Sequence, residues 1–178
     1  GYNLAHTKTA LQFIGGGYSS AEDYQFIYDD TTYNRDNNNM DQTFFGSRMQ
    51  YRPSLKTIVK SSVFLTKSDR GVAGSISFPS PHAKRINTLS LVSASLVRLL
   101  PSGHVRIHIS RRANDEQYTD PDLSNDSRHE VSAQALKLNF NQRLLKQLEA
   151  FTALELRSEM IKSNDVGNHN RTLSAITA

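Results

Sequence analysis

Hydrophobic and polar residues alternate along most of this chain, and breaks of two kinds separate the alternating stretches. Brief breaks lie at 52–56, 101–103 and 141–143, whereas long polar breaks lie at 29–40, 68–87, 114–127 and 163–170. A side-chain period of two is typical of β-strands. Short turns alternating with long loops are typical of a meander that crosses a bilayer. The pattern predicts an all-β fold, an antiparallel up-and-down meander that is part of a transmembrane β-barrel.

About eight strands are expected. The clearest has Val105, Ile107 and Ile109 on one face and Arg106, His108 and Ser110 on the other. The strands are predicted at 9–14, continuing past three glycines to 24–28, and at 43–51, 57–67, 89–100, 105–110, 131–140, 147–157 and from 171 onward. We expect the glycines 15–17 to mark close packing or a kink. Within 131–140 the alternation changes phase, which indicates either a β-bulge or a wrong assignment.

One segment has two interpretations. Residues 143–162 are rich in Leu, Glu, Lys, Ala and Gln, which favour helices. Residues 148–156 nevertheless alternate over five positions, as their neighbours in the sequence do. We therefore predict a strand here. The facing of 89–100 and of 131–140 is left open.

Composition narrows the class of protein. Hydrophobic residues make up 37% of the 178 residues, and no stretch approaches the ~20 consecutive apolar residues of a spanning helix. Barrel strands expose only every second residue to lipid, so a mean hydropathy of −0.53 is compatible with them. The chain has no cysteine, which excludes disulfides, thiolate metal sites and cysteine nucleophiles.

The net charge of +4 raises the question of nucleic acid, but the 21 basic residues are spread along the whole chain. We expect no nucleic-acid partner. The six histidines are scattered, no Gly-x-Ser-x-Gly elbow occurs, and we expect no enzymatic activity. The chain begins at Gly1 without the charged and apolar regions of a secretion signal.

Several motifs resemble a known family in their order and spacing. They are Tyr51-Arg52-Pro53, the run 67–74 (KSDRGVAG), the run 78–83 (FPSPHA), Gln117-Tyr118-Thr119-Asp120-Pro121 and the run 163–171 (SNDVGNHNR). Together they resemble the barrel of TonB-dependent outer-membrane receptors, most closely the cobalamin (vitamin B12) receptor type.

This resemblance implies a 22-stranded barrel filled by a plug domain, which imports a scarce ligand with energy relayed from the inner membrane. Residues 1–178 are then an internal portion of the barrel, without the plug and the terminal strands. The expected location is the cell outer membrane. The expected partners are outer-membrane lipid, the TonB complex through the plug, and a small-molecule ligand such as a corrinoid or iron chelate. Two alternatives stay open: a soluble secreted β-rich binding domain and a passive porin-like barrel.

The first long loop is acidic. Between residues 22 and 41 it carries six carboxylates and one arginine, with several asparagines among them. Carboxylate and amide oxygens are the ligands that calcium prefers. No cofactor is required by this reading, but Asp29, Asp30, Asp36 and Asp41 are candidate calcium ligands, and a solvated acidic loop is the alternative.

The second long loop is basic and apolar. Cations beside aromatic and proline groups suit a large, partly anionic ligand, although the same residues also rigidify loops. The candidate ligand-binding residues, including tyrosines expected at the barrel mouth, are Tyr28, Tyr33, Arg70, Phe78, His82, Arg85 and Tyr118.

Overall fold

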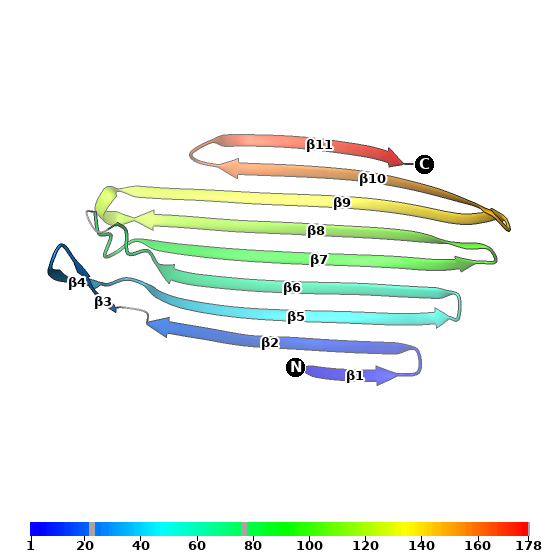
Figure 1. The fold of residues 1–178 in the computed structure, drawn as a ribbon, viewed down its shortest axis with the longest axis horizontal. Coiled ribbons are helices and arrows are strands. Elements are labelled where there is room, and N and C mark those ends of the chain that lie inside the picture. The colour runs from blue at the N-terminus through cyan, green and yellow to red at the C-terminus, as the bar shows by residue number, and fades with distance from the viewer. Residues whose placement is uncertain (22–23, 76–77, 178) are drawn as a thin grey trace.

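A computed structural model describes residues 1–21, 24–75 and 78–177. It is all-β, with a nine-stranded antiparallel sheet in the order β1-β2-β5-β6-β7-β8-β9-β10-β11 and a separate β3-β4 hairpin (Figure 1). The strands are β1 (Tyr2–His6), β2 (Thr9–Ala21), β3 (Tyr24–Tyr28), β4 (Thr31–Arg35), β5 (Asn39–Ser54), β6 (Thr57–Gly71), β7 (Lys84–Leu100), β8 (Gly103–Asp120), β9 (Asn125–Leu145), β10 (Leu148–Ser163) and β11 (Gly167–Thr177). Apart from the hairpin, sequence neighbours pair throughout, so the predicted up-and-down meander is confirmed.

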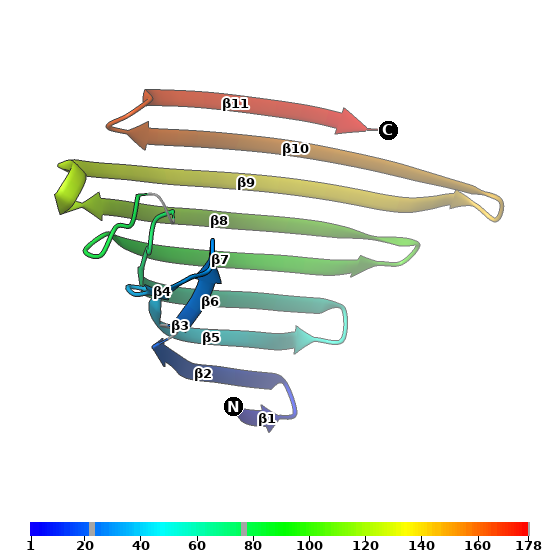
Figure 2. The ribbon, with the colours of Figure 1, turned by 60° about the vertical axis from the view of Figure 1, so that its left-hand side comes forward.

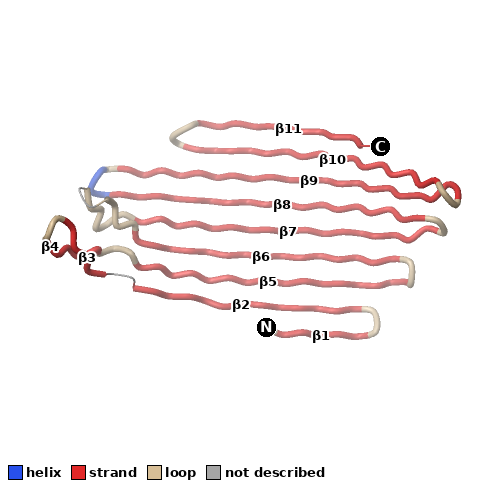
Figure 3. The backbone as a smooth tube through the Cα atoms, viewed as in Figure 1, coloured by secondary structure: helices blue, strands red, loops and turns tan. Residues whose placement is uncertain are grey.

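The connections differ between the two ends of the sheet (Figure 3). Two-residue turns at 7–8, 55–56, 101–102 and 146–147 lie at one end. The opposite end, called here the loop end, carries the β3-β4 excursion, the β6–β7 loop at 72–83, the short 3-10 helix Pro121–Leu123 and the β10–β11 turn at 164–166. The predicted sorting is present in part: the β2–β5 and β6–β7 connections are long, whereas the β8–β9 and β10–β11 connections are only four and three residues long.

Several predicted boundaries were wrong. The break at 141–143 lies inside β9, and the long breaks at 114–127 and 163–170 are mostly strand. Polar composition misled here, because these segments pair with equally polar neighbours, as Asp115 does with Glu130. In a solvent-exposed strand the backbone N–H and C=O groups pair with the neighbouring strand even when the side chains are polar.

The predicted first strand was also wrong. Residues 9–14 and 24–28 belong to different sheets, because β3 pairs only with β4 in its own hairpin. Asp29 and Asp30 form the turn of that hairpin, with φ of 51° and 58°. Two consecutive positive φ angles match the right-handed twist of a hairpin, and Asp tolerates them better than most residues.

Within the segment 143–162, residues 148–162 are strand, as predicted, while 143–145 end β9 and 146–147 form the turn; no bulge interrupts 131–140. The β9–β10 register runs without a shift from Phe140 to Val131. Leu136, Leu138 and Phe140 lie on one face, and Val131, Ala133 and Ala135 lie on the other. The apparent change of phase is therefore two apolar patches on opposite faces of a regular strand.

Register assigns every strand residue to one of two faces, because directly paired residues project to the same side. The face that carries Ile109 is called the apolar face, and the face that carries Ser110 is called the polar face. Five successive cross-strand rows, from the row of Val105 to the row of Ala113, form a mainly apolar band, called the apolar band, which also contains Arg98, Arg111 and Gln134. Its apolar side chains on β5 to β10 are Phe45, Met49, Tyr51, Val59, Val63, Leu65, Val92, Ala94, Leu96, Val105, Ile107, Ile109, Ala113, Leu136, Leu138, Phe140, Leu154, Leu156 and Met160.

The apolar band ends abruptly toward the loop end. The next row on the same face contains Lys67, Asp115, Glu130 and Lys162. Eight residue steps separate Val105 from Ala113, which is about 27 Å along the strand at about 3.4 Å per residue. The strands continue beyond the band, and their loop-end segments are mainly polar on both faces, with apolar exceptions such as Ile86 on one face and Leu89, Val131 and Ile161 on the other.

The sheet is a single layer without a core. Ala83 is the only buried hydrophobic residue among those described, and large apolar side chains such as Ile109 (52% exposed) stay accessible. The accessible surface is 12732 Å². A compact monomer of this mass has about 8,700 Å². The strands lie side by side as one curved layer in both views (Figures 1 and 2).

Of the two expectations for the glycines of β2, close packing or a kink, the structure shows close packing at Gly16. A Cβ on Gly16 would come within 2.9 Å of the Phe44 ring, so the ring lies directly over the bare backbone. The strand continues through Gly15, Gly16 and Gly17 in unbroken register with β5.

At the ends of the sheet, β1 pairs only with β2, and β11 pairs only with β10, among the residues in the described ranges.

Candidate functional site at the loop end

The two long loops are fastened to each other. Asn37, held in the left-handed region at φ 60°, donates from Nδ2 to the carbonyls of Ser80 at 2.8 Å and Ala83 at 2.7 Å. Arg35 Nη2 donates to the carbonyl of Gly74 at 2.8 Å. Ala83 is fully buried beneath these contacts. The side chains of Arg35 and Asn37 thus add hydrogen bonds to loop carbonyls, two of which also accept from backbone N–H groups, and so fix the relative position of the two loops.

A small cavity of about 130 Å³ lies where the loops meet. The rings of Phe26 and Tyr33 stack with centroids 5.7 Å apart and line it. Its remaining lining residues are Asn34, Arg35, Asp36, Ala73, Ser75, Pro79 and Pro81. Ligand pockets for whole small molecules are ~300–1,000 Å³. The cavity is therefore large enough for a single ring-sized group and too small for a whole ligand of that kind.

A cationic row lies below the loops on the polar face. Arg70 pairs with Arg85 across β6 and β7, and Arg85 pairs with Tyr118 across β7 and β8. The Arg85 Nε atom is buried and lies 3.6 Å from Glu116 Oε1, an ion-pair separation that is too long for a hydrogen bond. A buried N–H without a full partner is a donor available to an incoming acceptor.

Tyr118 closes this row. Its hydroxyl donates to Asp120 Oδ2 at 3.3 Å, and Asp120 is fully buried. Burial, and then the charge and hydrogen bond of Asp120, raise the pKa of Tyr118, while Arg85 lowers it by a smaller amount. Asp120 Oδ1 also accepts from the backbone N–H of Asp122 at 3.1 Å and so caps the 3-10 helix. The row is thus anchored to the β8–β9 connection.

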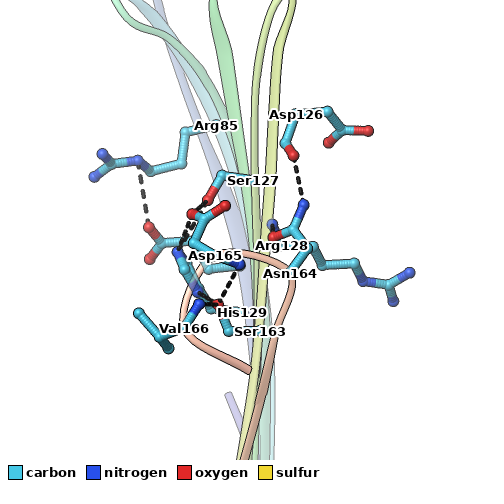
Figure 4. Close-up of polar contacts among 10 residues, drawn as sticks. Arg85, Asp126, Ser127, Arg128, His129, Ser163, Asn164, Asp165 and Val166 are labelled. Atoms are coloured by element: carbon cyan, nitrogen blue, oxygen red, sulfur yellow. Dashed lines mark hydrogen bonds and ion pairs between the residues drawn. The ribbon is translucent and has the colours of Figure 1, made fainter. Parts of the chain in front are cut away.

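A second polar cluster connects β9 to the β10–β11 turn (Figure 4), and sequence analysis did not identify it. His129 Nδ1 lies 2.8 Å from Ser163 Oγ, and its Nε2 lies 3.1 Å from Ser127 Oγ. Ser127 in turn donates to Asp165. Asn164 adds two contacts, accepting from the N–H of Arg128 at 2.8 Å and donating to the carbonyl of Asp126.

The cluster contains Ser, His and Asp, but its geometry is not that of a hydrolytic triad. In a triad the carboxylate orients the ring nitrogen opposite the one that faces the serine. Here Asp165 lies nearest Nε2, at 3.6 Å, on the same side as Ser127, while Ser163 occupies the opposite nitrogen. Ser163 Oγ also accepts from the N–H groups of Asp165 and Val166. These contacts fasten the turn to the sheet. Only pairing of β9 with β10 brings the four residues together, so sequence spacing gave no signal.

The seven predicted ligand-binding residues are partly brought together. Arg70, Arg85 and Tyr118 are cross-strand neighbours, and Tyr33 lines the cavity. Tyr28 ends β3, away from that lining.

The other two predicted residues lie in the β6–β7 loop. Phe78 is 80% exposed, and His82 Nδ1 lies 3.1 Å from Asp122 Oδ2, which connects the loop to the 3-10 helix. Their role in ligand binding stays a prediction.

The predicted calcium ligands are spread out. Asp29 and Asp30 occupy the tip of the β3-β4 hairpin, whereas Asp41 is within β5, paired with Asp69. No group of three or more His, Asp or Glu side chains is placed to hold a metal ion in the described part of the chain. Glu22 and Asp23, two carboxylates of the acidic loop, lie outside the described residues. Weak calcium binding stays a prediction, checked by titration calorimetry of the full-length protein.

Comparisons with known proteins identify no relative: no family model, no curated protein and no solved structure matches this chain. A search of the described residues for helices long and apolar enough to span a membrane finds none. Functional conclusions therefore rest on the residues and their geometry.

Proposed function

We propose that this chain forms part of the wall of an outer-membrane β-barrel that takes up a scarce ligand, in the manner of a TonB-dependent receptor for a corrinoid or iron chelate. The single observation that carries the barrel is the apolar band. Most side chains in five rows on one face of a one-layer sheet are apolar, with Arg98 and Arg111 as the charged exceptions, at the height where three rows of the other face carry eight charged side chains. A sheet with these two faces suits a boundary between lipid and an aqueous lumen.

The dimensions of the band support this proposal. Barrel strands are tilted by ~35–45°, so a band of ~27 Å along the strand corresponds to ~20 Å of membrane normal, near the ~25 Å expected. Strands of 15 to 18 residues, as in β6 and β8, exceed the ~9–11 residues needed to span. The surplus lies toward the loop end, where both faces are mainly polar and where receptors of this kind collect ligand.

Two observations favour a receptor over a passive pore. The long loops are cross-fastened by Arg35 and Asn37, and this fixes their conformation in the way that a binding site requires. The buried, unsatisfied Arg85 N–H and its neighbour Arg70 face the same side as the polar wall. TonB dependence itself, and the corrinoid or iron-chelate class of ligand, rest on the family resemblance of the sequence motifs.

A soluble secreted domain is the competing proposal. It requires a second layer to cover the apolar band, because contiguous apolar surface of this extent is rare on soluble monomers. Fractionation of the full-length gene product separates the two. Recovery in the outer membrane, with an electrophoretic mobility that shifts on heating, is expected for a barrel. A soluble product without that shift overturns the proposal.

A further inference from the structure

The polar face carries an excess of cations at the height of the apolar band. Three adjacent rows, those of His108, Ser110 and Arg112, contain six basic residues and two acidic ones. The basic residues are Arg48, Lys60, Arg112, Lys137, Arg157 and Arg171, and the acidic residues are Glu155 and Glu159. This part of the face therefore has a net charge of +4 with histidine neutral.

Both acidic residues are already engaged. Glu155 pairs with Lys137 at 2.9 Å, and Glu159 pairs with Arg157 at 2.5 Å and with Arg171. Arg48, Lys60 and Arg112 make no ion pair with any residue in the described ranges. Arg48 lies opposite Ser62, and Lys60 is its diagonal neighbour. Diagonal Cα atoms are ~7–8 Å apart, so the two long side chains reach the same anion.

Hydroxyl groups lie between these cations. Ser62, Ser93 and Ser110 occupy one row on β6, β7 and β8. The Ser62 and Ser93 oxygens are 2.8 Å apart, so one hydroxyl donates to the other and one hydrogen remains available to a ligand. Arg48 and Lys60 thus lie near one end of this hydroxyl row and Arg112 near the other, with Phe64 and Leu91 in the same row as Arg112.

Two cavities adjoin the hydroxyl row. One of about 610 Å³ is lined by Arg48, Gln50 and Lys60, and one of about 330 Å³ is lined by Ser110 and Arg112. Ser62 and Ser93 line both. Their volumes fall within the range of small-molecule sites. The arrangement provides charge, hydrogen-bond donors and space in one place.

We infer that this polar wall binds a small anionic solute through phosphate or carboxylate groups, with Arg48, Lys60 and Arg112 as the charged contacts. The inference deepens the proposed function, because it assigns an anionic character to what the barrel lumen accommodates. Charge-assisted hydrogen bonds to phosphate or carboxylate are about twice as strong as neutral ones, and arginine adds a bidentate geometry. The serine hydroxyls complete the contacts of the anion.

Equilibrium dialysis of the full-length protein with inorganic pyrophosphate, at fixed ionic strength, tests this inference. The test variant is Arg48→Gln, Lys60→Gln and Arg112→Gln combined. The matched control is Lys8→Gln, Lys56→Gln and Lys146→Gln, which removes the same charge from three short turns. We expect the wild type and the control to bind, and the test variant to bind at least ~10-fold more weakly, since its charge-assisted contacts to the anion are lost together.

Equal loss in both variants, or no binding by the wild type, overturns the inference. The heat-dependent mobility shift of all three proteins is recorded in parallel. A retained shift without pyrophosphate binding refutes the anion site and leaves the barrel standing. Binding without a shift refutes the barrel and leaves an anion site on a soluble sheet.

Discussion

A charge placed at the centre of the apolar band tests the orientation of the sheet most directly. Ile109 lies in the third of the five rows and is 52% exposed, so its side chain has no covering partner. In a bilayer this position is near the midplane, where an arginine costs ~2–4 kcal/mol. Ile109→Arg is therefore expected to lower the free energy of unfolding by that amount.

Two neighbouring variants serve as controls. Gln117→Arg is on the same strand and the same face but two rows beyond the edge of the band, so its cost is expected to be ~0–1 kcal/mol. Ser110→Arg is adjacent in sequence and projects to the polar face, where water screens the added charge, so its cost is also expected below ~1 kcal/mol. The ordering of the three variants thus depends on both depth and face.

The assay is a urea titration of the full-length protein folded into phosphatidylcholine vesicles. The readout is circular dichroism, which reports the loss of strand structure. An Ile109→Arg variant as stable as the wild type refutes the assignment of the apolar face to lipid. Equal destabilisation by Ile109→Arg and Gln117→Arg refutes the depth of the band.

Three further predictions concern the loop end and the turns. Asn37→Ala removes the two short hydrogen bonds that fasten the loops, each worth ~0.5–1.5 kcal/mol, so the local opening free energy is expected to fall by ~1–3 kcal/mol. Hydrogen exchange at the loop amides measures this change, and unchanged exchange would refute the fastening. The raised pKa of Tyr118 means that folding favours its neutral form: this contribution to stability is fully present below the unfolded pKa near 10.0 and is lost as pH rises through the folded value. Ultraviolet titration of the phenol checks it, and Asp120→Asn should reduce the shift without abolishing it, because burial is the larger cause. Gly103→Ala places a Cβ 2.0 Å from the carbonyl oxygen of Asn141. We therefore expect the free energy of unfolding to fall by more than ~1 kcal/mol in the same urea assay. A neutral result would contradict the close approach of β8 and β9 at that turn.

The sequence by itself determined the class of fold and most of the strand centres. Alternation such as that of Val105 to Ser110 leaves no other regular structure, because only a strand separates odd from even positions onto two faces. The same alternation was enough to assign 148–156 to a strand against its helix-favouring composition. Strand ends were less predictable, since polar residues such as Asp115 and Glu130 pair in a ladder as well as they occupy a loop.

What the tertiary structure decided is which residues are neighbours across strands. The row of Arg70, Arg85 and Tyr118, the cluster around His129 and the unpaired cations beside Ser62 each join residues from different strands. Their proximity depends on register, and a shift of one residue would move every side chain to the opposite face. Register is set by the turns together with the burial of one face, so it is a property of the paired sheet. Local sequence determines that a strand forms, whereas pairing determines what the strand presents at each height.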